Sequence, residues 1–383
     1  MGKSFRKVLF WCHLGFGIAA GLVILLMSLT GVLLTYEKQM IAWAETRPYR
    51  VGSSEGAVPL SPEEVLRRVK QVEPGRPVTF LVRADRTLPA AIALDDGRTL
   101  QVDPYTGAVL GEGAPAVRRF FRFVTNWHRW LGTEGAGRAT GKAITGACNL
   151  AFLFVIVSGF YLWFPPQKTW SRFKSILWFQ RGLPAKARDF NWHNVIGFWS
   201  LGPLFLVVLS ATVISYPWAS NLAYRVMGEE PPRPAAPARP AAPSGTTPTA
   251  PTGAKAPVEG RIDGPWRVAA AHAPGWRTLS LRLPEKPDAP LVFTVDHGTG
   301  GQPQKRATLT LAQGTGEILK WEPFSSFGPG RKFRTFLRFA HTGEVGGLVG
   351  QTLAGVVTFG TLFLGWTGFA LAWRRFRSWR ARR

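Results

Sequence analysis

Histidines are the residues of this chain whose placement most clearly indicates chemistry. Four of the six lie at, or shortly before, the start of a long run that contains no charged side chain. His13 lies in the run 8–36 and His193 in the run 191–224. His128 precedes the run 143–164, and His341 precedes the run 345–373. Each run therefore brings one imidazole.

Two imidazoles that converge from facing helices suit a haem iron better than a zinc ion. Zinc normally takes three or four protein ligands, and no Cys, Asp or Glu joins either pair within the runs. A haem needs only two axial ligands because its porphyrin supplies four nitrogens. We expect two bis-His b haems, one between His13 and His193 and one between His128 and His341. The alternative is that these imidazoles only snorkel toward the membrane surface.

The two pairs are expected at different depths. A helix rises about 1.5 Å per residue, so the stretch from His13 to Tyr36 covers roughly 35 Å. Small residues should lie at similar depths on the neighbouring runs, where we interpret them as room for a flat macrocycle. They are Thr30 with Gly31, Ser158 with Gly159, Ser210 with Ala211, and Thr367 with Gly368. Ordinary close packing of membrane helices is the alternative.

The elements that must position these residues are transmembrane helices. The chain is 46% hydrophobic and only 18% charged, and each charge-free run reaches the roughly 20 residues that a helix needs to cross a bilayer. We therefore predict an α-helical membrane protein. Its four transmembrane segments are expected at 8–36, at 127–164 including a histidine segment, at 191–218 and at 341–373.

The net charge of +24 is interpreted as a signal of membrane topology, not of nucleic-acid binding. Lys and Arg prefer the cytoplasmic flanks of membrane segments, and they cluster at the N-terminus, in the 165–190 loop and in the 374–383 tail. We expect these three segments in the cytoplasm of a bacterium, with the chain in the inner membrane. The basic tail is also expected to attract anionic lipid.

The chain is predicted to be two parallel repeats, each with a span, a periplasmic domain and a second span. The first span aligns with the third without a gap, so that His13 matches His193. Small α+β domains are expected at 37–126, together with an amphipathic segment, and at 261–330. The 229–260 segment, rich in Pro and Ala, is predicted to be a disordered linker.

Other residues give weaker signals. His272 is expected on a helix surface and His297 in a turn, with a transient iron contact as the alternative. Cys12 is interpreted as a small packing residue, and two cysteines cannot form a disulfide framework. The basic aromatic segments 118–123 and 331–339 are expected to be interfacial helices or a rim that receives an anionic substrate.

The order of these motifs resembles the PepSY-associated transmembrane helix family. The motifs are FWCHLGFGIAAG, SPEEVLRRVKQ, DDGRTLQVDPYTGAVLGEG, WHRWLG, WHNVIGFW and FAHTGEVGGLVGQTLAG. The resemblance covers nearly the whole chain apart from the linker. It implies PepSY-like external domains and two b haems between four helices, with ligand roles for His13, His128, His193 and His341. That family includes inner-membrane ferrisiderophore reductases.

We therefore expect an oxidoreductase that reduces a ferric siderophore or another ferric chelate in the periplasm. Electrons would come from a cytoplasmic reductase or from membrane quinol, because no GxGxxG nucleotide motif opens a helix here. Two alternatives stay open. One is an electron conduit to a different periplasmic acceptor, and the other is a non-enzymatic protein whose PepSY-like units bind or inhibit a peptidase.

Overall fold

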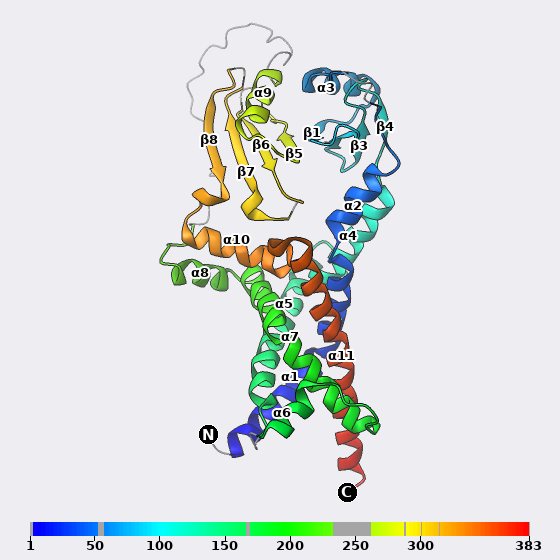
Figure 1. Cartoon of the computed structure of the whole chain (residues 1–383), viewed down its shortest axis with the longest axis vertical. Helices are drawn as coiled ribbons and strands as arrows, with labels where there is room; N and C mark the ends of the chain where they lie inside the picture. Colours follow the sequence, from blue (N-terminus) through cyan, green and yellow to red (C-terminus); the bar gives the residue numbers. More distant parts are fainter. Residues whose placement is uncertain are drawn as a thin grey trace.

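A bundle of long helices carries a β-sheet at one end and both chain termini at the other (Figure 1). This computed structural model describes residues 3–52, 57–165, 169–232, 262–286, 289–299, 301–313 and 315–382. Most of the predicted 229–260 linker lies outside the described residues. The helices are α1 (Lys3–Leu34), α2 (Glu37–Thr46), α3 (Pro62–Val72), α4 (Pro115–Trp130), α5 (Gly137–Trp163), α6 (Trp170–Leu177), α7 (Ala185–Ser215), α8 (Pro217–Val226), α9 (Asp263–His272), α10 (Pro329–His341) and α11 (Gly347–Arg380).

Short 3₁₀ turns and strands complete the described elements. The turns are η1 (Pro303–Lys305), η2 (Phe324–Ser326) and η3 (Glu344–Gly346). The strands are β1 (Pro77–Arg83), β2 (Ala90–Leu94), β3 (Thr99–Val102), β4 (Val109–Gly111), β5 (Thr278–Arg282), β6 (Leu291–Asp296), β7 (Arg306–Leu311) and β8 (Ile318–Pro323). The order of elements from α1 to α5 is the same as the order from α7 to α11, with α6 between the two halves.

Four helices are long and apolar enough to cross a membrane, which confirms the four predicted helices. They are α1 continued by α2, then α5, α7, and α11 preceded by η3. Large apolar side chains stay exposed along them, for example Leu22 at 76% and Val349 at 80%. A continuous apolar surface of this kind suits contact with lipid, so this is a helical membrane protein.

The third of these helices begins earlier and ends earlier than the predicted 191–218. Proline disfavours a helical conformation in the residue before it, and Tyr216 is extended, with φ −118° and ψ 123°, directly before Pro217. The chain therefore leaves α7 and starts α8. At the other end, α7 includes the charged Asp189, which is buried and paired with Arg188 and Arg374 at 2.9 and 2.7 Å. This pairing allows the helix to begin within a basic loop.

The long helices form a four-cornered bundle. α1 packs against α5 and α11, and α7 packs against the same two helices. α1 and α7 therefore occupy opposite corners. Buried apolar side chains from three of the helices fill part of the interior, namely Ile156, Leu204, Val208 and Val357.

The two predicted external units share one sheet, which the sequence did not indicate. Within the described residues, eight antiparallel strands follow the order β4-β3-β2-β1-β5-β6-β7-β8. The two halves meet where β1 pairs with β5, with Leu81 opposite Ser280. Each half has its own apolar core, and Leu66 and Trp266 pack against both cores. The units are therefore joined side by side.

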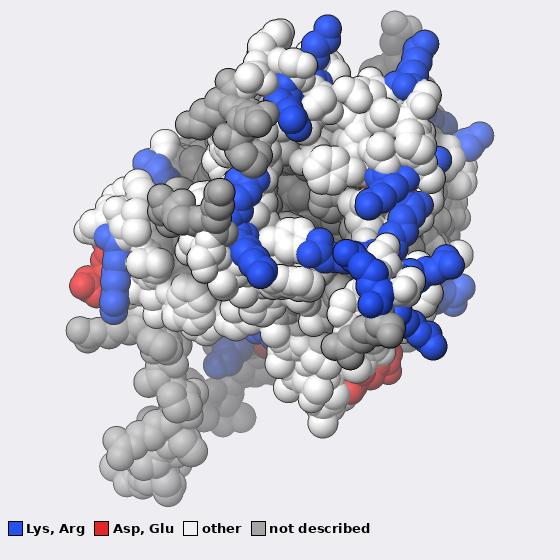
Figure 2. Space-filling view, turned by 90° about the horizontal axis from the view of Figure 1, so that it is seen from below, with Lys and Arg blue, Asp and Glu red and all other residues white. Residues whose placement is uncertain are grey.

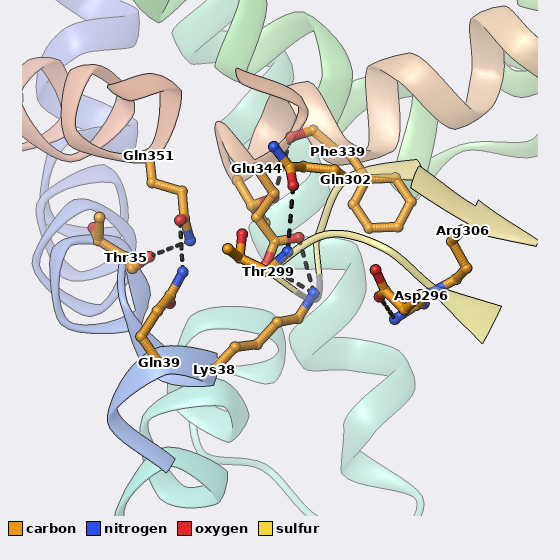
Figure 3. A network of polar contacts seen from close by, with 11 residues as sticks. Thr35, Lys38, Gln39, Asp296, Thr299, Gln302, Arg306, Phe339, Glu344 and Gln351 are labelled. Atoms are coloured by element: carbon orange, nitrogen blue, oxygen red, sulfur yellow. Dashed lines mark hydrogen bonds and ion pairs between the residues drawn. The ribbon is translucent and has the colours of Figure 1, made fainter. Parts of the chain in front are cut away.

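Polar contacts connect the sheet to the helices (Figure 3). Lys38 of α2 forms an ion pair with Glu344 of η3 at 2.7 Å. Gln39 donates to Gln351 at 2.7 Å, and Gln351 donates to the Thr35 carbonyl at 3.0 Å. The loop between β6 and β7 lies against the same network. These contacts hold the start of α2 against the start of α11. Gln304, between β6 and β7, donates to the Val345 carbonyl at 3.0 Å and so ties the sheet to the same place.

The end of the molecule that carries the termini is strongly basic. Lys and Arg side chains are spread over this face, while Asp and Glu are seen at its margin (Figure 2). Exposed basic residues here include Arg172, Lys174 and Arg181, between α5 and α7, and Lys186 at the start of α7. The two ends of the helix bundle therefore differ in charge as well as in structure.

Candidate functional site

The structure brings His128 and His341 together at the end of the bundle below the sheet. Their ring centres lie 6.2 Å apart with an angle of 49° between the ring planes. A metal ion bonded to one nitrogen of each ring at about 2.0–2.1 Å would hold the ring centres roughly 6 Å apart. The spacing of this outer pair therefore fits one metal ion between two imidazoles.

His13 and His193 form an inner pair nearer the termini. They come from α1 and α7, at opposite corners of the bundle, and are close enough to interact electrostatically. On α1, His13 and Thr30, the residue that contacts His128, are separated by roughly 25 Å along the helix axis. The two pairs are therefore stacked along the bundle and not clustered.

Hydroxyl groups orient both rings of the inner pair. His13 Nδ1 lies 2.9 Å from Ser158 Oγ, and His193 Nδ1 lies 3.0 Å from Thr367 Oγ1. Each hydroxyl donates its own hydrogen to the carbonyl four residues earlier, at 2.7 Å in both cases. The hydroxyl oxygen can then only accept from the ring. We infer that both rings carry their proton on Nδ1, which leaves the Nε2 lone pair available for a metal.

The outer pair reaches the same tautomer by two different contacts. His128 Nδ1 lies 3.0 Å from Thr30 Oγ1, whose hydrogen is donated to a backbone carbonyl. His341 Nδ1 lies 2.9 Å from the Val207 carbonyl, which is an acceptor only. Ser210 donates to that same carbonyl at 2.8 Å. All four imidazoles therefore have Nε2 as the free ligand atom.

Burial lowers the pKa of both outer rings and so favours their neutral form. α4 and α10 lie outside the four membrane-crossing helices, and burial lowers the pKa of His128 to about 4, helped by the nearby His341. Burial also lowers the pKa of His341. A neutral imidazole is the form that binds a metal ion.

The three glycines that we expected to leave room for a macrocycle instead lie against the histidine rings themselves. A Cβ atom would come within 3.1 Å (Gly159), 3.4 Å (Gly31) and 3.6 Å (Gly368) of a histidine Cε1 atom. These glycines therefore let the rings approach the helix backbones, and the adjacent hydroxyls accept the Nδ1 hydrogens. Ser210 and Ala211 are buried in α7.

The weaker candidates lie away from both pairs. The His272 ring packs edge-on against Trp321, with centres 4.8 Å apart. The His297 backbone N–H donates to the Lys305 carbonyl at 2.9 Å. Cys12 is exposed on α1, so it is not the packing residue that we expected. None of the three joins the four ligand candidates.

Each histidine pair offers two ligands. In the part of the chain that the structure describes, no three His, Cys, Asp or Glu side chains come close enough to hold a metal ion together. Two axial imidazoles with a free Nε2 fit an iron whose four equatorial donors come from a porphyrin. All four rings are also only half-buried, so protein does not fully cover them.

An open cavity of about 620 Å³ lies between α2, α4 and the start of α5. Its lining combines basic and aromatic side chains with two carboxylates, and the four arginines outnumber the acids. The charged and aromatic members are Arg118, Arg119, Arg122, Arg138, Glu37, Glu134, Phe123 and Trp130. α4 separates this cavity from the outer pair, because the lining residues and His128 lie on different faces of that helix. Basic and aromatic groups together suit an anionic ligand with a flat apolar part.

Comparison with known proteins identifies the family. A comparison with curated proteins gave no match. The family described as PepSY-associated TM region matches residues 10–375, which include all four paired histidines. With nearly the whole length matched, the chain belongs to the PepSY-associated TM region family.

Proposed function

We propose that this protein is a di-haem b reductase of the bacterial inner membrane. It would pass electrons from a cytoplasmic reductase or membrane quinol to a ferric chelate, such as a ferric siderophore, in the periplasm. The observation that carries the proposal is the set of two facing imidazole pairs, each ring fixed with Nε2 free. When bound, the haems supply one-electron chemistry, and each ferric ion takes one electron to become ferrous.

The chain's own residues would hold and separate the two haems. His13 and His193 would bind the inner iron, and His128 and His341 the outer iron. Apolar side chains between the pairs, such as Leu204 and Val208, keep water and ions out of the bundle. The residues therefore provide ligands at two depths in the bundle, whose interior also holds buried polar side chains such as Asn149 and Ser200.

The repeated order of elements supports two parallel repeats related by an axis along the membrane normal. In this arrangement each half supplies one ligand to each haem. The basic end with the termini would face the cytoplasm, since Lys and Arg prefer that side. The eight-stranded sheet would then stand in the periplasm as two joined PepSY-like units.

The open cavity beside α4 supports an anionic substrate. Its guanidinium groups would attract the carboxylates or catecholates that carry ferric ions, and its aromatic rings would pack against flat chelating groups. One helix separates it from the outer pair, so a chelate bound there would lie near the electron donor.

The test is a reduced-minus-oxidised absorption spectrum of the purified protein with haem quantification. We expect b-type bands and two haems per chain, and their absence would refute the proposal. Pre-reduced protein mixed with a ferric siderophore should be reoxidised faster than with the iron-free siderophore. If only cupric ion or a partner cytochrome reoxidises it, the chain is a conduit to another acceptor. Binding of a peptidase by haem-free protein would instead favour the non-enzymatic alternative.

A further inference from the structure

Three arginines line a small cavity beside the outer histidine pair. Arg129 comes from the end of α4, and Arg334 and Arg338 come from α10. Val213 and Ile214 of α7 complete the lining of this cavity of about 160 Å³. α4, α7 and α10 meet here at the end of the bundle below the sheet (Figure 1).

The arginines and the outer histidines belong to one site. Arg334, Arg338 and His341 are spaced by four and three residues, which places them on one face of α10. Arg129 directly follows His128. Arg338 interacts electrostatically with His341, and Arg129 interacts with His128. The positive charges therefore lie at the end of the bundle that also holds the outer pair.

These guanidinium groups have no carboxylate partner among the described residues. Arg334 donates only to the Ser220 hydroxyl, at 2.8 Å, and Arg129 lies over the Trp130 ring at 4.5 Å. By contrast, Arg331 on the same helix pairs with Glu322 at 3.3 Å. Like charges around one small cavity repel each other, and a bound anion would relieve this repulsion.

The geometry points to this cavity as the site that binds the propionate carboxylates of the haem held by His128 and His341. The inference rests on the proposed function, because it requires a haem between these two rings. Guanidinium groups form bidentate, charge-assisted hydrogen bonds with carboxylates, and a b haem carries two propionates. A lipid phosphate would offer the same guanidinium chemistry, so the experiment must separate the two anions.

The first measurement is the rate at which each haem leaves the full chain. The protein is purified in a phosphate-free detergent and mixed with an excess of a haem-binding apoprotein. We expect Arg334→Gln/Arg338→Gln to release the outer haem about tenfold faster or more, since hydrogen bonds to charged groups are lost. The inner haem should leave at the wild-type rate, which shows that the variant is folded. Arg331→Gln is the matched control and should change neither rate.

The second measurement removes the carboxylates from the ligand. Haem-free protein is reconstituted with haem or with haem dimethyl ester, whose propionates carry no charge. The wild-type protein should release the ester about tenfold faster than haem from the outer site, because the ester lacks the charged partners. The double variant should release both at the same rate.

The outcomes separate the inference from the function on which it rests. A wild-type protein without b-type bands refutes the proposed function. If b-type bands are present but the wild type and the double variant discriminate haem from its ester equally, only the propionate assignment is wrong. An effect of the variant that appears only in phospholipid vesicles, and equally for haem and ester, would assign the arginines to lipid phosphate and also overturn the inference.

Discussion

The inner and outer histidine pairs use the same ligand type but are built differently. The inner rings lie on the long helices α1 and α7, and both donate to hydroxyls of neighbouring membrane helices. The outer rings lie on the short helices α4 and α10, and one of them donates to a backbone carbonyl. Packing of the bundle therefore fixes the inner site, whereas the outer site also depends on how α4 and α10 are held near the sheet.

The two sites also differ in charge. Near the inner pair, the carboxylate of Asp189 pairs with both Arg188 and Arg374 and offsets one of their two positive charges. Near the outer pair, Arg129, Arg334 and Arg338 have no carboxylate partner among the described residues. Positive charge favours the reduced form of a redox centre because that form carries one more electron. The difference predicts a higher reduction potential at the outer haem, which would favour electron flow away from the basic end.

The largest expected effect comes from removing a ligand. His13→Ala or His193→Ala should abolish the inner haem, and His128→Ala or His341→Ala should abolish the outer one, because one imidazole cannot complete the axial pair. Haem per chain would fall from two to one in each variant, as measured by quantitative absorption spectroscopy. Loss of the same spectral component in His13 and His128 variants would contradict the pairing.

The hydroxyl contacts test the asymmetry within the outer pair. Thr30→Val removes the acceptor of His128 Nδ1 and should weaken binding of the outer haem roughly 10- to 100-fold, as for other groups that orient metal ligands. Ser210→Ala is the matched variant and should change binding less than about threefold, because His341 donates to the Val207 carbonyl. Haem titration of the haem-free protein measures both, and equal effects would show that Ser210 also orients a ring.

Removing the ion pair between Lys38 and Glu344 tests whether the contacts near the sheet stabilise the outer haem site more than the inner one. Glu344 is 7% exposed. Lys38→Met would therefore leave its buried carboxylate without the positive charge of the Lys38 ammonium group. We expect a loss of roughly 1–3 kcal/mol, reduced from the fully buried case because Lys38 is partly exposed. Thermal unfolding followed at the outer and inner haem bands should show a larger change in the outer band. Lys38→Met/Glu344→Gln should recover part of the stability, and a uniform shift of both bands would argue against a separate role.

The smallest expected effect concerns the charge near the inner haem. Asp189 and His193 are four residues apart on α7, and therefore lie on the same face. Asp189→Asn removes a negative charge, so the inner potential should rise by about 30–60 mV, where 59 mV corresponds to tenfold for one electron. A spectroelectrochemical titration measures both haems in one sample. A fall in the reduction potential of the inner haem would contradict this prediction.

The sequence predicted the four membrane helices because they depend on local charge-free runs, and the histidine pairs were predicted from the match between the two halves of the chain. It did not identify the partners of Nδ1. Whether Thr30 faces a ring or only packs depends on the rotation of α1 about its axis, which charge-free runs do not determine. The short helices α2 and α8 were also missed. α8 lies largely within the charge-free run 191–224, so the sequence did not separate it from α7, whereas α2 begins with Glu37 directly after the first run.

The single sheet was not predictable for a different reason. Small α+β domains were predicted in both halves, but not how their strands pair with one another. Pairing between them depends on which edges the fold leaves open, and the partners Leu81 and Ser280 are far apart in sequence. A local pattern contains no information about such a contact.

The pairing of β1 with β5 also has a consequence for how the nascent chain folds during synthesis. Residues that meet beside it, such as Glu63 and Asp263, are 200 positions apart in the chain. At about 5–20 residues per second, a ribosome needs roughly 10–40 s to synthesise that stretch. During this time β1 is an unpaired strand edge, able to pair with β1 of another nascent chain. Nascent chains kept apart until the second half arrives would therefore yield more correctly assembled protein, and strong overexpression would yield exchanged dimers.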